Sequence, residues 1–299
     1  MRFAKYHGLG NDFLVVDLRQ ASAAQIGLIR NHAVALCDRH YGIGADGVLA
    51  VFASPTADAR MQVINSDGSE PEMCGNGIRC VAKQLFDRGG VVKPTIAIDT
   101  GAGVLRCAID ADGSWARSIT VSMGAPRFAR GEIPMTGSAG ERCIEQPLDI
   151  AGHPSRQVTC VSMGNPHAIT FVESKPLARE LATSIGPLVE RHAWFPNRTN
   201  AEFAHMASRH EIDLDVWERG CGITLACGTG ACATVAAAIV TGRADEATPI
   251  RVNLPGGSLE ITVPRGLTDV LMKGPAVHVF DVELEPADLE RISRAIPTR

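Results

Sequence analysis

The stretch Cys227-Gly228-Thr229-Gly230-Ala231-Cys232 decides the fold, because the chain contains a close copy of it, Cys74-Gly75-Asn76-Gly77-Ile78-Arg79-Cys80. Both copies read Cys-Gly-x-Gly, both lead into an apolar segment, and about half the chain separates them. Two further pairs share nearly the same offset: Gly10-Asn11 recurs as Gly164-Asn165, and Asn65 and Glu218 precede their cysteines by the same interval. We therefore predict an internal duplication in which each half presents one Cys-Gly-x-Gly element.

Length and composition indicate a globular protein with room for two domains. The chain has 299 residues, of which 45% are hydrophobic, so each half can bury a core. Its net charge of −4 gives no basic footprint for nucleic acid. The N-terminus lacks the apolar region of a signal peptide, and the longest apolar run is too short to span a bilayer. We expect a cytoplasmic, soluble protein without nucleic-acid or membrane partners.

The nine cysteines argue against both a disulfide scaffold and a metal site. Their number is odd, and the chain otherwise resembles cytoplasmic proteins. The spacings 74–80 and 221–227 leave five residues between the cysteines, too many for the Cys-x₂₋₄-Cys knuckle that binds zinc, and no second knuckle or His pair completes a site with Cys227 and Cys232. We therefore expect no metal. Four cysteines outside the motifs should be buried as small apolar side chains: Cys37, Cys107, Cys143 and Cys160.

The hydrophobic pattern predicts mixed α/β structure in the first half. Ser22-Ala23-Ala24-Gln25 is a capping-box pattern that opens a helix ending near residue 40. A second helix, 78–86, follows the first Cys-Gly-x-Gly motif and ends before Gly89-Gly90. The β-branched run after His7–Phe13 reads as a strand entered from a glycine loop. Further strands are predicted over 48–52, 60–65, 95–100, 104–109 and 118–123.

The second half repeats this theme after a segment rich in Gly, Pro and Arg, 124–140, which we interpret as the domain boundary. The helix after the second Cys-Gly-x-Gly motif, 230–241, is apolar all round and should be buried on every side. Another helix is predicted over 177–192, and the chain closes with a strand, 276–282, and a helix, 286–296. The remaining strands are predicted over 157–163, 167–172, 200–206 and 211–217, with two more flanking Pro255-Gly256-Gly257.

Two Cys-Gly-x-Gly elements at helix starts favour one kind of chemistry. A helix N-terminus offers unpaired N–H groups and positive potential, and glycines allow close approach, so it can bind a carboxylate. A cysteine placed there has its thiolate favoured. Two such elements facing one cavity would hold a carboxylate and place one sulfur on each side of its α-carbon.

That geometry suits inversion of an amino acid at its α-carbon. A thiolate on one face would remove the α-proton while a thiol on the other face returns one, in opposite protonation states. Donors held on the carboxylate oxygens in a water-excluded site would stabilise the carbanion. The sequence contains no Walker loop and no obvious lysine for pyridoxal phosphate, so we expect no cofactor.

The longer motifs resemble the diaminopimelate epimerase family over essentially the whole chain. The resemblance rests on five stretches in the order found in that family: 7–13, 65–70 with 73–77, 163–167, 218–220 and 226–230. It implies two pseudo-symmetric α/β domains, each a β-sheet or barrel wrapped around a central helix, with the active site in the interdomain cleft. It also implies that the last strand and helix fold back, giving an N-terminal domain of 1–125 plus 276–299 and a C-terminal domain of 126–275.

The resemblance further implies cofactor-independent conversion of L,L-2,6-diaminopimelate to the meso form, a step toward lysine and peptidoglycan precursors. Cys74 and Cys227 take the places of the two acid/base residues, with His167 and Glu218 as their supporting pair. The backbone at Gly75-Asn76 and Gly228-Thr229 would bind the α-carboxylate. Five side chains would hold the substrate, Arg219 being suited to a carboxylate: Asn11, Asn65, Asn165, Asn200 and Arg219.

Three positions depart from the family pattern. Ile223 stands where a Glu is common, and Gly47 where some relatives have Gln, so both bear on recognition of the far end of the substrate. Phe280 stands where a Tyr is often found near the C-terminal strand, so it bears on the homodimer that the resemblance otherwise implies. Cys221 has no assignment from the sequence.

Three alternatives remain open at this point. Gly228-Thr229-Gly230-Ala231-Cys232-Ala233 matches the loose Gly-x-Gly-x-x-Gly/Ala pattern of nicotinamide-dinucleotide sites, but no strand leads directly into the first glycine. A two-cysteine racemase acting on another amino acid would keep the chemistry and change the substrate, as Ile223 would permit. A thiol redox protein would instead use Cys74 and Cys227 for reversible disulfide cycling.

Overall fold

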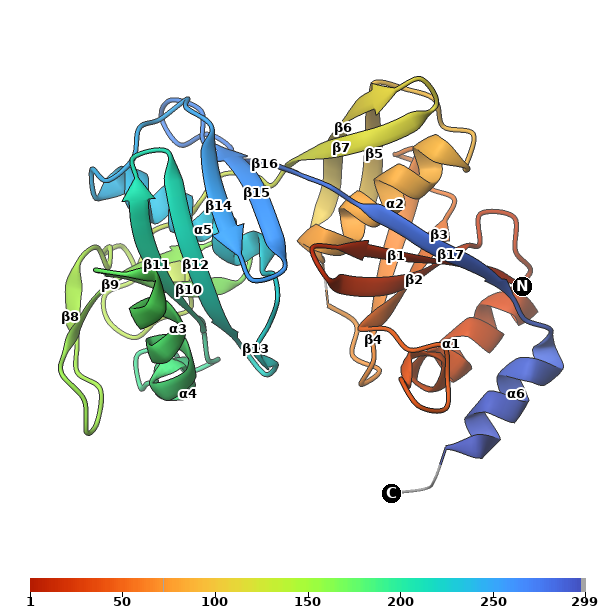
Figure 1. Ribbon diagram of the computed structural model, residues 1–299, viewed down its shortest axis with the longest axis horizontal. Coiled ribbons are helices and arrows are strands. Elements are labelled where there is room, and N and C mark those ends of the chain that lie inside the picture. Colours follow the sequence, from red (N-terminus) through yellow and green to blue (C-terminus); the bar gives the residue numbers. More distant parts are fainter. Residues whose placement is uncertain (72, 297–299) are drawn as a thin grey trace. The chain divides into compact units, whose positions relative to one another are not determined.

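The computed structural model describes residues 1–71 and 73–296. The chain forms two compact units, here called unit 1 (Met1–Val121 with the segment from Gly274 onward) and unit 2 (Ser122–Lys273). Each unit combines β-strands with a few helices, which confirms the predicted mixed α/β class (Figure 1). Each also contains one helix that begins immediately after a cysteine of the duplicated motif.

Unit 1 opens with a hairpin where the sequence predicted a single strand. β1 (Arg2–Gly8) pairs antiparallel with β2 (Asn11–Asp17). The two residues between them, Leu9 and Gly10, have φ of 56° and 84°, which is the left-handed backbone that a tight two-residue hairpin turn requires. The turn therefore delivers Asn11 to the end of the hairpin.

The rest of unit 1 surrounds its central helix. α2 (Gly75–Asp87) contacts strands β1 to β6, and eleven of its residues are buried, among them the guanidinium-bearing Arg79. The last strand, β17 (Val277–Glu283), pairs with β1, and α6 (Pro286–Ala295) packs on α1 (Figure 1). The other elements are α1 (Ala23–Cys37), β3 (Gly47–Phe52), β4 (Ala59–Asn65), β5 (Thr95–Thr100), β6 (Gly103–Asp112) and β7 (Trp115–Ser122). The predicted capping box, formed by Ser22 and Gln25, is confirmed.

Unit 2 is built around α5 (Gly228–Val240), which contacts strands on several sides and is buried over most of its length, as predicted. Its strands are β8 (Gln146–Leu148), β9 (Arg156–Ser162), β10 (Pro166–Val172), β11 (Asn200–Ser208), β12 (Glu211–Glu218), β13 (Gly222–Ile223), β14 (Ile250–Leu254), β15 (Gly257–Thr262) and β16 (Leu271–Gly274), with a short 3₁₀ turn, η1 (Arg130–Glu132). β10 and β11 run parallel with His167 opposite Asn200. This pairing brings together two segments that carry candidate site residues.

One predicted helix is divided in two. The sequence pattern predicted a single helix over 177–192, whereas the chain forms α3 (Lys175–Ser184) and α4 (Gly186–Glu190). A Cβ atom on Gly186 would lie 2.6 Å from Cβ of Trp217, so only glycine fits this close approach. Pro187 then supplies no backbone donor, and the hydrogen-bonded helix cannot continue through it.

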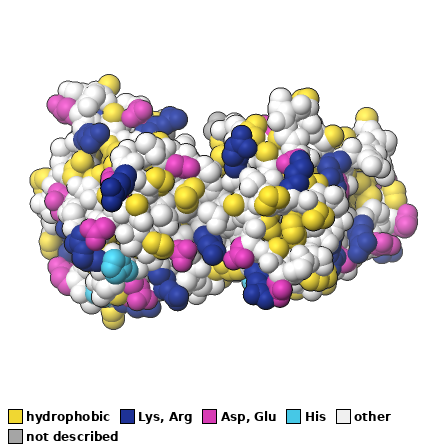
Figure 2. Space-filling view, turned by 90° about the horizontal axis from the view of Figure 1, so that it is seen from above, with side chains coloured by type: hydrophobic (Ala, Val, Ile, Leu, Met, Phe, Trp, Pro, Cys, Tyr) yellow, Lys and Arg dark blue, Asp and Glu magenta, His cyan; other side chains and the backbone are white. Residues whose placement is uncertain are grey.

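The surface carries mixed charge. On the face shown in Figure 2, Lys and Arg side chains are interspersed with Asp and Glu. Across residues 1–71 and 73–296, no helix has both the length and the apolar character that a membrane span requires. The four cysteines predicted to be packing residues, Cys37, Cys107, Cys143 and Cys160, are all buried.

Candidate active site

The first cysteine stands at the start of the central helix of unit 1. Cys74 is the N-cap of α2, with extended backbone angles, and its sulfur accepts a hydrogen bond from the backbone N–H of Gly77 at 3.4 Å. Its side chain is only partly buried. A Cβ on Gly77 would lie 3.0 Å from a methyl group of Leu49, so glycine lets the helix start pack close to β3. The motif thus places a sulfur beside the unpaired N–H groups of a helix N-terminus.

Asn11 lies between this helix start and an acidic residue of a neighbouring loop. Its Nδ2 donates to Oδ2 of Asp46 at 2.7 Å. Its Oδ1 accepts from Nδ2 of Asn76 at 3.1 Å and lies 3.9 Å from Sγ of Cys74, whose thiol can donate to it. The structure therefore brings together three predicted site residues: Asn11, Cys74 and Asn76. We call them, with Asp46, the Cys74 site.

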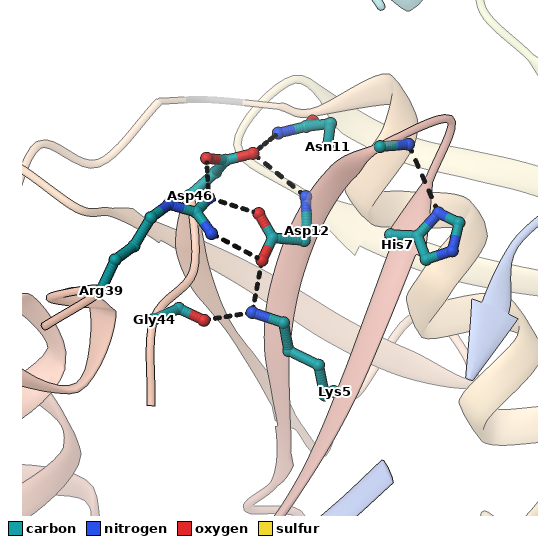
Figure 3. A network of polar contacts seen from close by, with 8 residues as sticks. Lys5, His7, Asn11, Asp12, Arg39, Gly44 and Asp46 are labelled. Carbon is teal, nitrogen blue, oxygen red and sulfur yellow. Dashed lines mark hydrogen bonds and ion pairs between the residues drawn. The ribbon is translucent and has the colours of Figure 1, made fainter. Parts of the chain in front are cut away.

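A partly exposed ionic network lies beside Asn11 of the Cys74 site (Figure 3). Nζ of Lys5 contacts Asp12 and the carbonyl oxygen of Gly44, and Nη2 of Arg39 lies 2.6 Å from Asp12 and 2.7 Å from Asp46. Burial alone would raise the pKa of Asp12, but hydrogen bonds from Arg39 and Lys5 lower it. Asp12 therefore remains charged, and its contacts with Lys5 and Arg39 hold the start of β2 against the loop before β3.

Asn65 stands at the end of β4, and its side chain faces the turn that follows. Its Nδ2 donates to the hydroxyl of Ser69 at 2.9 Å. The next residue, Ser66, donates its backbone N–H to the carbonyl oxygen of Asp46 at 2.9 Å. The turn is thereby tied to the same loop as the Cys74 site. The described hydrogen bonds of the Asn65 side chain do not reach the cysteine.

Cys227 is the N-cap of α5, and its environment differs from that of Cys74. It is only 5% exposed. Burial, together with the nearby carboxylates of Glu218 and Glu202, raises its pKa well above that of an ordinary thiol, and a hydrogen bond with Thr229 opposes this only in part. The expectation of a lowered pKa is therefore wrong for Cys227, because burial and two nearby carboxylates raise it.

His167 is fully buried and connects a carboxylate to the duplicated asparagine of unit 2. Its Nδ1 lies 2.6 Å from Oε1 of Glu202, and its Nε2 lies 2.9 Å from Oδ1 of Asn165. Nδ2 of Asn165 donates to the Thr229 hydroxyl at 3.3 Å, and that hydroxyl lies 3.6 Å from Sγ of Cys227. We call these five residues the Cys227 site.

Glu218 adds a second carboxylate to this site. It ends β12, and its Oε1 accepts a hydrogen bond from the hydroxyl of Thr224. Burial, together with the charge of Glu202, raises its pKa, and hydrogen bonds from Thr224 and Cys227 and the charge of His167 oppose this only in part. Both members of the pair predicted to support the two thiols thus lie in unit 2 with Cys227.

Two predicted substrate-binding residues make hydrogen bonds to the backbone. Nδ2 of Asn200 donates to the carbonyl oxygen of Pro166 at 2.9 Å, and its Oδ1 accepts from the backbone N–H of Arg219 at 2.9 Å. Asn200 is buried and holds the segment around Arg219 in place. The Arg219 side chain is exposed and donates to the carbonyl oxygen of Asn197 at 3.3 Å. Its guanidinium keeps further donors that could bind a carboxylate.

The structure adds residues that the sequence reasoning did not single out. Glu202 and Asp46 each contact a duplicated asparagine, through His167 in unit 2 and directly in unit 1. The sequence does mark Glu202 as unusual, because it is a charged residue inside the otherwise apolar run 201–204.

Two residues that the sequence analysis left without a clear role lie at the β12–β13 turn. Ile223, in place of the usual Glu, pairs with Trp217 across β12 and β13 and packs against the apolar core of unit 2. Cys221 is exposed in the turn between those strands.

Each site combines a sulfur with donors for a negatively charged group. At both helix starts the first backbone N–H groups have no partner within the helix, and a carboxylate can accept from them. Sulfur can hold or release a proton beside such a carboxylate. Each site on its own can therefore bind an acid group and exchange one proton next to it.

Comparison with known proteins identifies the sequence relatives. The sequence model of the family described as Diaminopimelate epimerase matches residues 3–129 and 159–279. The chain is 50% identical to the diaminopimelate epimerase of a Synechocystis species over 289 residues, covering 95% of this chain and 99% of the relative. It is 45% identical to the diaminopimelate epimerase of Heliobacterium modesticaldum over 285 residues, with the same coverage of both chains.

Solved structures with a similar fold come from more distant proteins. A hydroxyproline epimerase from Agrobacterium vitis, with bound trans-4-hydroxy-L-proline, superposes with a TM-score of 0.67 at 14% identity, covering 95% of this chain and 90% of that one. A methylitaconate-delta-isomerase gives 0.65 at 13% identity, covering 97% of each chain. These similarities show a shared pseudo-symmetric two-domain fold.

Proposed function

This chain belongs to the diaminopimelate epimerase family, and we propose that it interconverts L,L- and meso-diaminopimelate without a cofactor, using Cys74 and Cys227 as the two acid/base residues. The observation that carries the proposal is that both cysteines are N-caps of the buried central helices of their units. A carboxylate bound by either helix start would have its α-carbon next to a sulfur.

We infer the direction of the first turnover from the charge around Cys227. Because burial and two carboxylates raise its pKa, Cys227 carries its proton in the free protein. With Cys74 as the thiolate, the substrate would then lose its α-proton to that sulfur, so that the Cα–H bond breaks and an S–H bond forms. Cys227 would give its proton to the opposite face of the same carbon and would be left as a thiolate. The return reaction uses the two sulfurs in exchanged roles.

The remaining site residues would stabilise the negative charge that develops during this step. Backbone N–H groups at Gly75-Asn76 and Gly228-Thr229 would donate to the α-carboxylate oxygens, whose charge grows as the carbanion delocalises into them. His167 and Glu218 would adjust the charge next to Cys227. Arg219 would pair with the distal carboxylate of diaminopimelate, together with the polar side chains of Asn65 and Asn200.

The decisive experiment follows hydrogen exchange at the α-carbon. The reduced protein would be incubated with L,L-diaminopimelate in deuterated water, and the α-proton signal and the stereochemistry would be followed by NMR and chiral chromatography. We expect deuterium to enter with inversion. Cys74→Ser and Cys227→Ser should each lose about 10²–10⁴-fold in turnover, the range typical of a lost acid/base group.

Cys221→Ser is the matched control, because it removes an exposed thiol close in sequence to the site. It should keep wild-type turnover. Unimpaired turnover in Cys74→Ser or Cys227→Ser would contradict the two-base mechanism. Exchange with another amino acid, and none with diaminopimelate, would keep the mechanism and reassign the substrate. Activity that survives loss of both cysteines, or a response to a nicotinamide dinucleotide, would contradict the whole proposal.

We further propose that the protein acts in the cytoplasm as a homodimer. β17 exposes three apolar side chains, Val277, Val279 and Phe280, each between 43% and 51% exposed, and such residues at a strand surface support association. Light scattering of the wild type and of Phe280→Asp tests this arrangement. A wild-type mass equal to one chain would contradict it.

A further inference from the structure

The Cys74 site contains a line of hydrogen bonds whose direction is fixed at both ends. At one end Oδ2 of Asp46 accepts from Asn11 (Figure 3), and Asn11 in turn accepts from Asn76. At the other end Oδ1 of Asn76 accepts from Nη2 of Arg79 at 2.9 Å. A carboxylate can only accept and a guanidinium can only donate. The two amides between them therefore have one orientation each.

Both ends of this line are held firmly. Asp46 pairs with Arg39 at 2.7 Å, donates its backbone N–H to the carbonyl oxygen of Asp12 at 2.8 Å, and accepts from Ser66. Arg79 is fully buried and also donates to the carbonyl oxygens of Gly75 at 3.0 Å and Pro275 at 3.2 Å. Neither end group can turn without breaking several hydrogen bonds.

The orientation decides what Asn11 presents to the sulfur. Its carbonyl oxygen lies 3.9 Å from Sγ of Cys74, so it can accept from the thiol but offers nothing to a thiolate. The reversed amide would present an N–H group and would stabilise the thiolate further. The helix N-terminus already favours the thiolate, and a more stabilised thiolate is a weaker base. The observed orientation therefore preserves the basicity of Cys74.

We propose that Asp46 is a positioning residue of the Cys74 site, which holds Asn11 with its carbonyl oxygen toward Asn76 and the sulfur of Cys74. Asp46 acts through Asn11, with Arg39 fixing its own carboxylate. Only the effect of Asp46 on turnover rests on the proposed epimerase function. The positioning itself can be measured without a substrate.

The direct test is NMR of the side-chain amide of Asn11 in the full-length ¹⁵N-labelled protein. Its signals are identified by their absence in Asn11→Ser. In the wild type we expect slow solvent exchange, because one N–H is bound to a carboxylate. Asp46→Ala should speed that exchange several-fold and shift both proton signals. Asp46→Asn keeps an acceptor oxygen at the same place and should restore most of the wild-type pattern.

The matched control is Asp17→Ala, which removes another carboxylate of unit 1, one paired with Arg19 at 2.6 Å. It should leave the Asn11 signals unchanged. Wild-type exchange and shifts in Asp46→Ala would overturn the proposal. Changes in Asp46→Asn as large as those in Asp46→Ala would also overturn it, because an amide oxygen can still accept from Asn11.

A second readout follows the sulfur. Alkylation of Cys74 by iodoacetamide at neutral pH is measured by peptide mass spectrometry, with the exposed Cys221 of unit 2 as internal reference. In Asn76→Leu only Asp46 still orients the Asn11 amide. Adding Asp46→Ala lets Asn11 turn its N–H group to the sulfur, and Cys74 should then react several-fold faster relative to Cys221 than in Asn76→Leu alone, since the thiolate is the nucleophile. An unchanged or lower ratio in the double variant would overturn the proposal.

Turnover separates this proposal from the function on which it builds. If the chain is the proposed epimerase, Asp46→Ala should lower kcat several-fold with faster solvent exchange confined to the Asn11 amide, which general unfolding would not produce. If the wild type exchanges no α-proton, the proposed function fails, and the NMR and alkylation results still decide the role of Asp46. If the wild type is active and Asp46→Ala shows wild-type exchange at Asn11, only the positioning role fails.

Discussion

The two cysteine sites use the same duplicated asparagine in opposite directions. In unit 1 the carbonyl oxygen of Asn11 points to the helix start, where Asn76 and Cys74 lie. In unit 2 the carbonyl oxygen of Asn165 points away, to His167, and its NH₂ group donates to Thr229 at the helix start. One sulfur therefore faces an acceptor, and the other lies beside a hydroxyl that an amide holds in place.

The end groups explain the difference. In unit 1 Asp46 and Arg79 allow only one direction of donation. In unit 2 the line ends on an imidazole, whose nitrogens can each donate or accept. If Nδ1 of His167 donates to Glu202, Nε2 can donate to Asn165 only when the ring carries a second proton. The hydrogen bonds of unit 1 therefore run in one fixed direction, whereas those of unit 2 depend on whether His167 carries a second proton.

The largest expected effect concerns the buried pair that ends the unit 2 line. Glu202 and His167 are both fully buried, and Glu202→Ala would leave the imidazole without its partner. Loss of one member of a buried pair costs about 3–5 kcal/mol of unfolding free energy. Asp46→Ala, at a partly exposed ion pair of unit 1, should cost about 1 kcal/mol or less. Urea unfolding of both variants measures the difference.

Glu202→Gln is the control, because it keeps an oxygen that can accept from Nδ1 of His167. It should recover most of the stability lost in Glu202→Ala. Equal destabilisation by Glu202→Ala and Asp46→Ala would mean that the two carboxylates stabilise their units equally, which would contradict the difference between the two sites.

Next in size is the effect of a methyl group on the second glycine of each motif. A Cβ on Gly230 would lie 3.0 Å from Oε1 of Glu202 and 3.2 Å from Sγ of Cys227, whereas one on Gly77 would meet a leucine methyl that can move. Both substitutions add a better helix former, a gain of about 1 kcal/mol. We expect Gly77→Ala to remain within about 0.5 kcal/mol of the wild type and Gly230→Ala to lose about 1–2 kcal/mol through strain. Thermal unfolding of Gly77→Ala and Gly230→Ala measures this difference in stability. Equal melting temperatures of the two variants would contradict the difference in packing.

The sequence predicted the frame of both sites. The repeated Cys-Gly-x-Gly motif located both helix starts, and the resemblance supplied candidate partners such as His167, which does lie in the Cys227 site. These predictions succeeded because a local motif fixes an N-cap and its first turn. The split between α3 and α4 was missed although Pro187 is a local signal for it; only the close contact of Gly186 with Trp217 is distant in sequence.

The polar anchors could not be predicted for the same reason. Asp46 meets Asn11 only through the packing of a loop against the β1–β2 hairpin. Glu202 meets His167 only because β10 and β11 pair in one register, which sequence alone does not give. The raised pKa of Cys227 follows from these contacts. Local reasoning from the helix dipole therefore gave the wrong sign for that thiol.

A smaller effect sharpens the contrast between the sulfurs. Because the pKa of Cys227 is raised, its thiolate fraction at pH ~8.5, where an exposed thiol is half ionised, should be lower than that of an exposed cysteine. Iodoacetamide should therefore modify Cys227 more slowly than Cys221. Glu218→Gln removes one raising charge and should increase the rate at Cys227 several-fold. Peptide mass spectrometry over pH 6–10 measures both, and equal rates for Cys227 and Cys221 would contradict the raised pKa.

The smallest effect isolates the hydroxyl that joins Asn165 to Cys227. Thr229→Val keeps the shape of the side chain but removes a hydrogen bond, at a cost of about 0.5–1.5 kcal/mol. Because the Thr229 hydroxyl lowers the pKa of Cys227, its removal should also slow alkylation of Cys227, while Thr229→Ser should restore the rate. In unit 1 the matching position is an amide that contacts Asn11 directly, so Asn76→Leu should leave alkylation of Cys227 unchanged. Slower alkylation in Thr229→Val but not in Thr229→Ser would establish that this hydroxyl, and not packing, connects the asparagine of unit 2 to its sulfur.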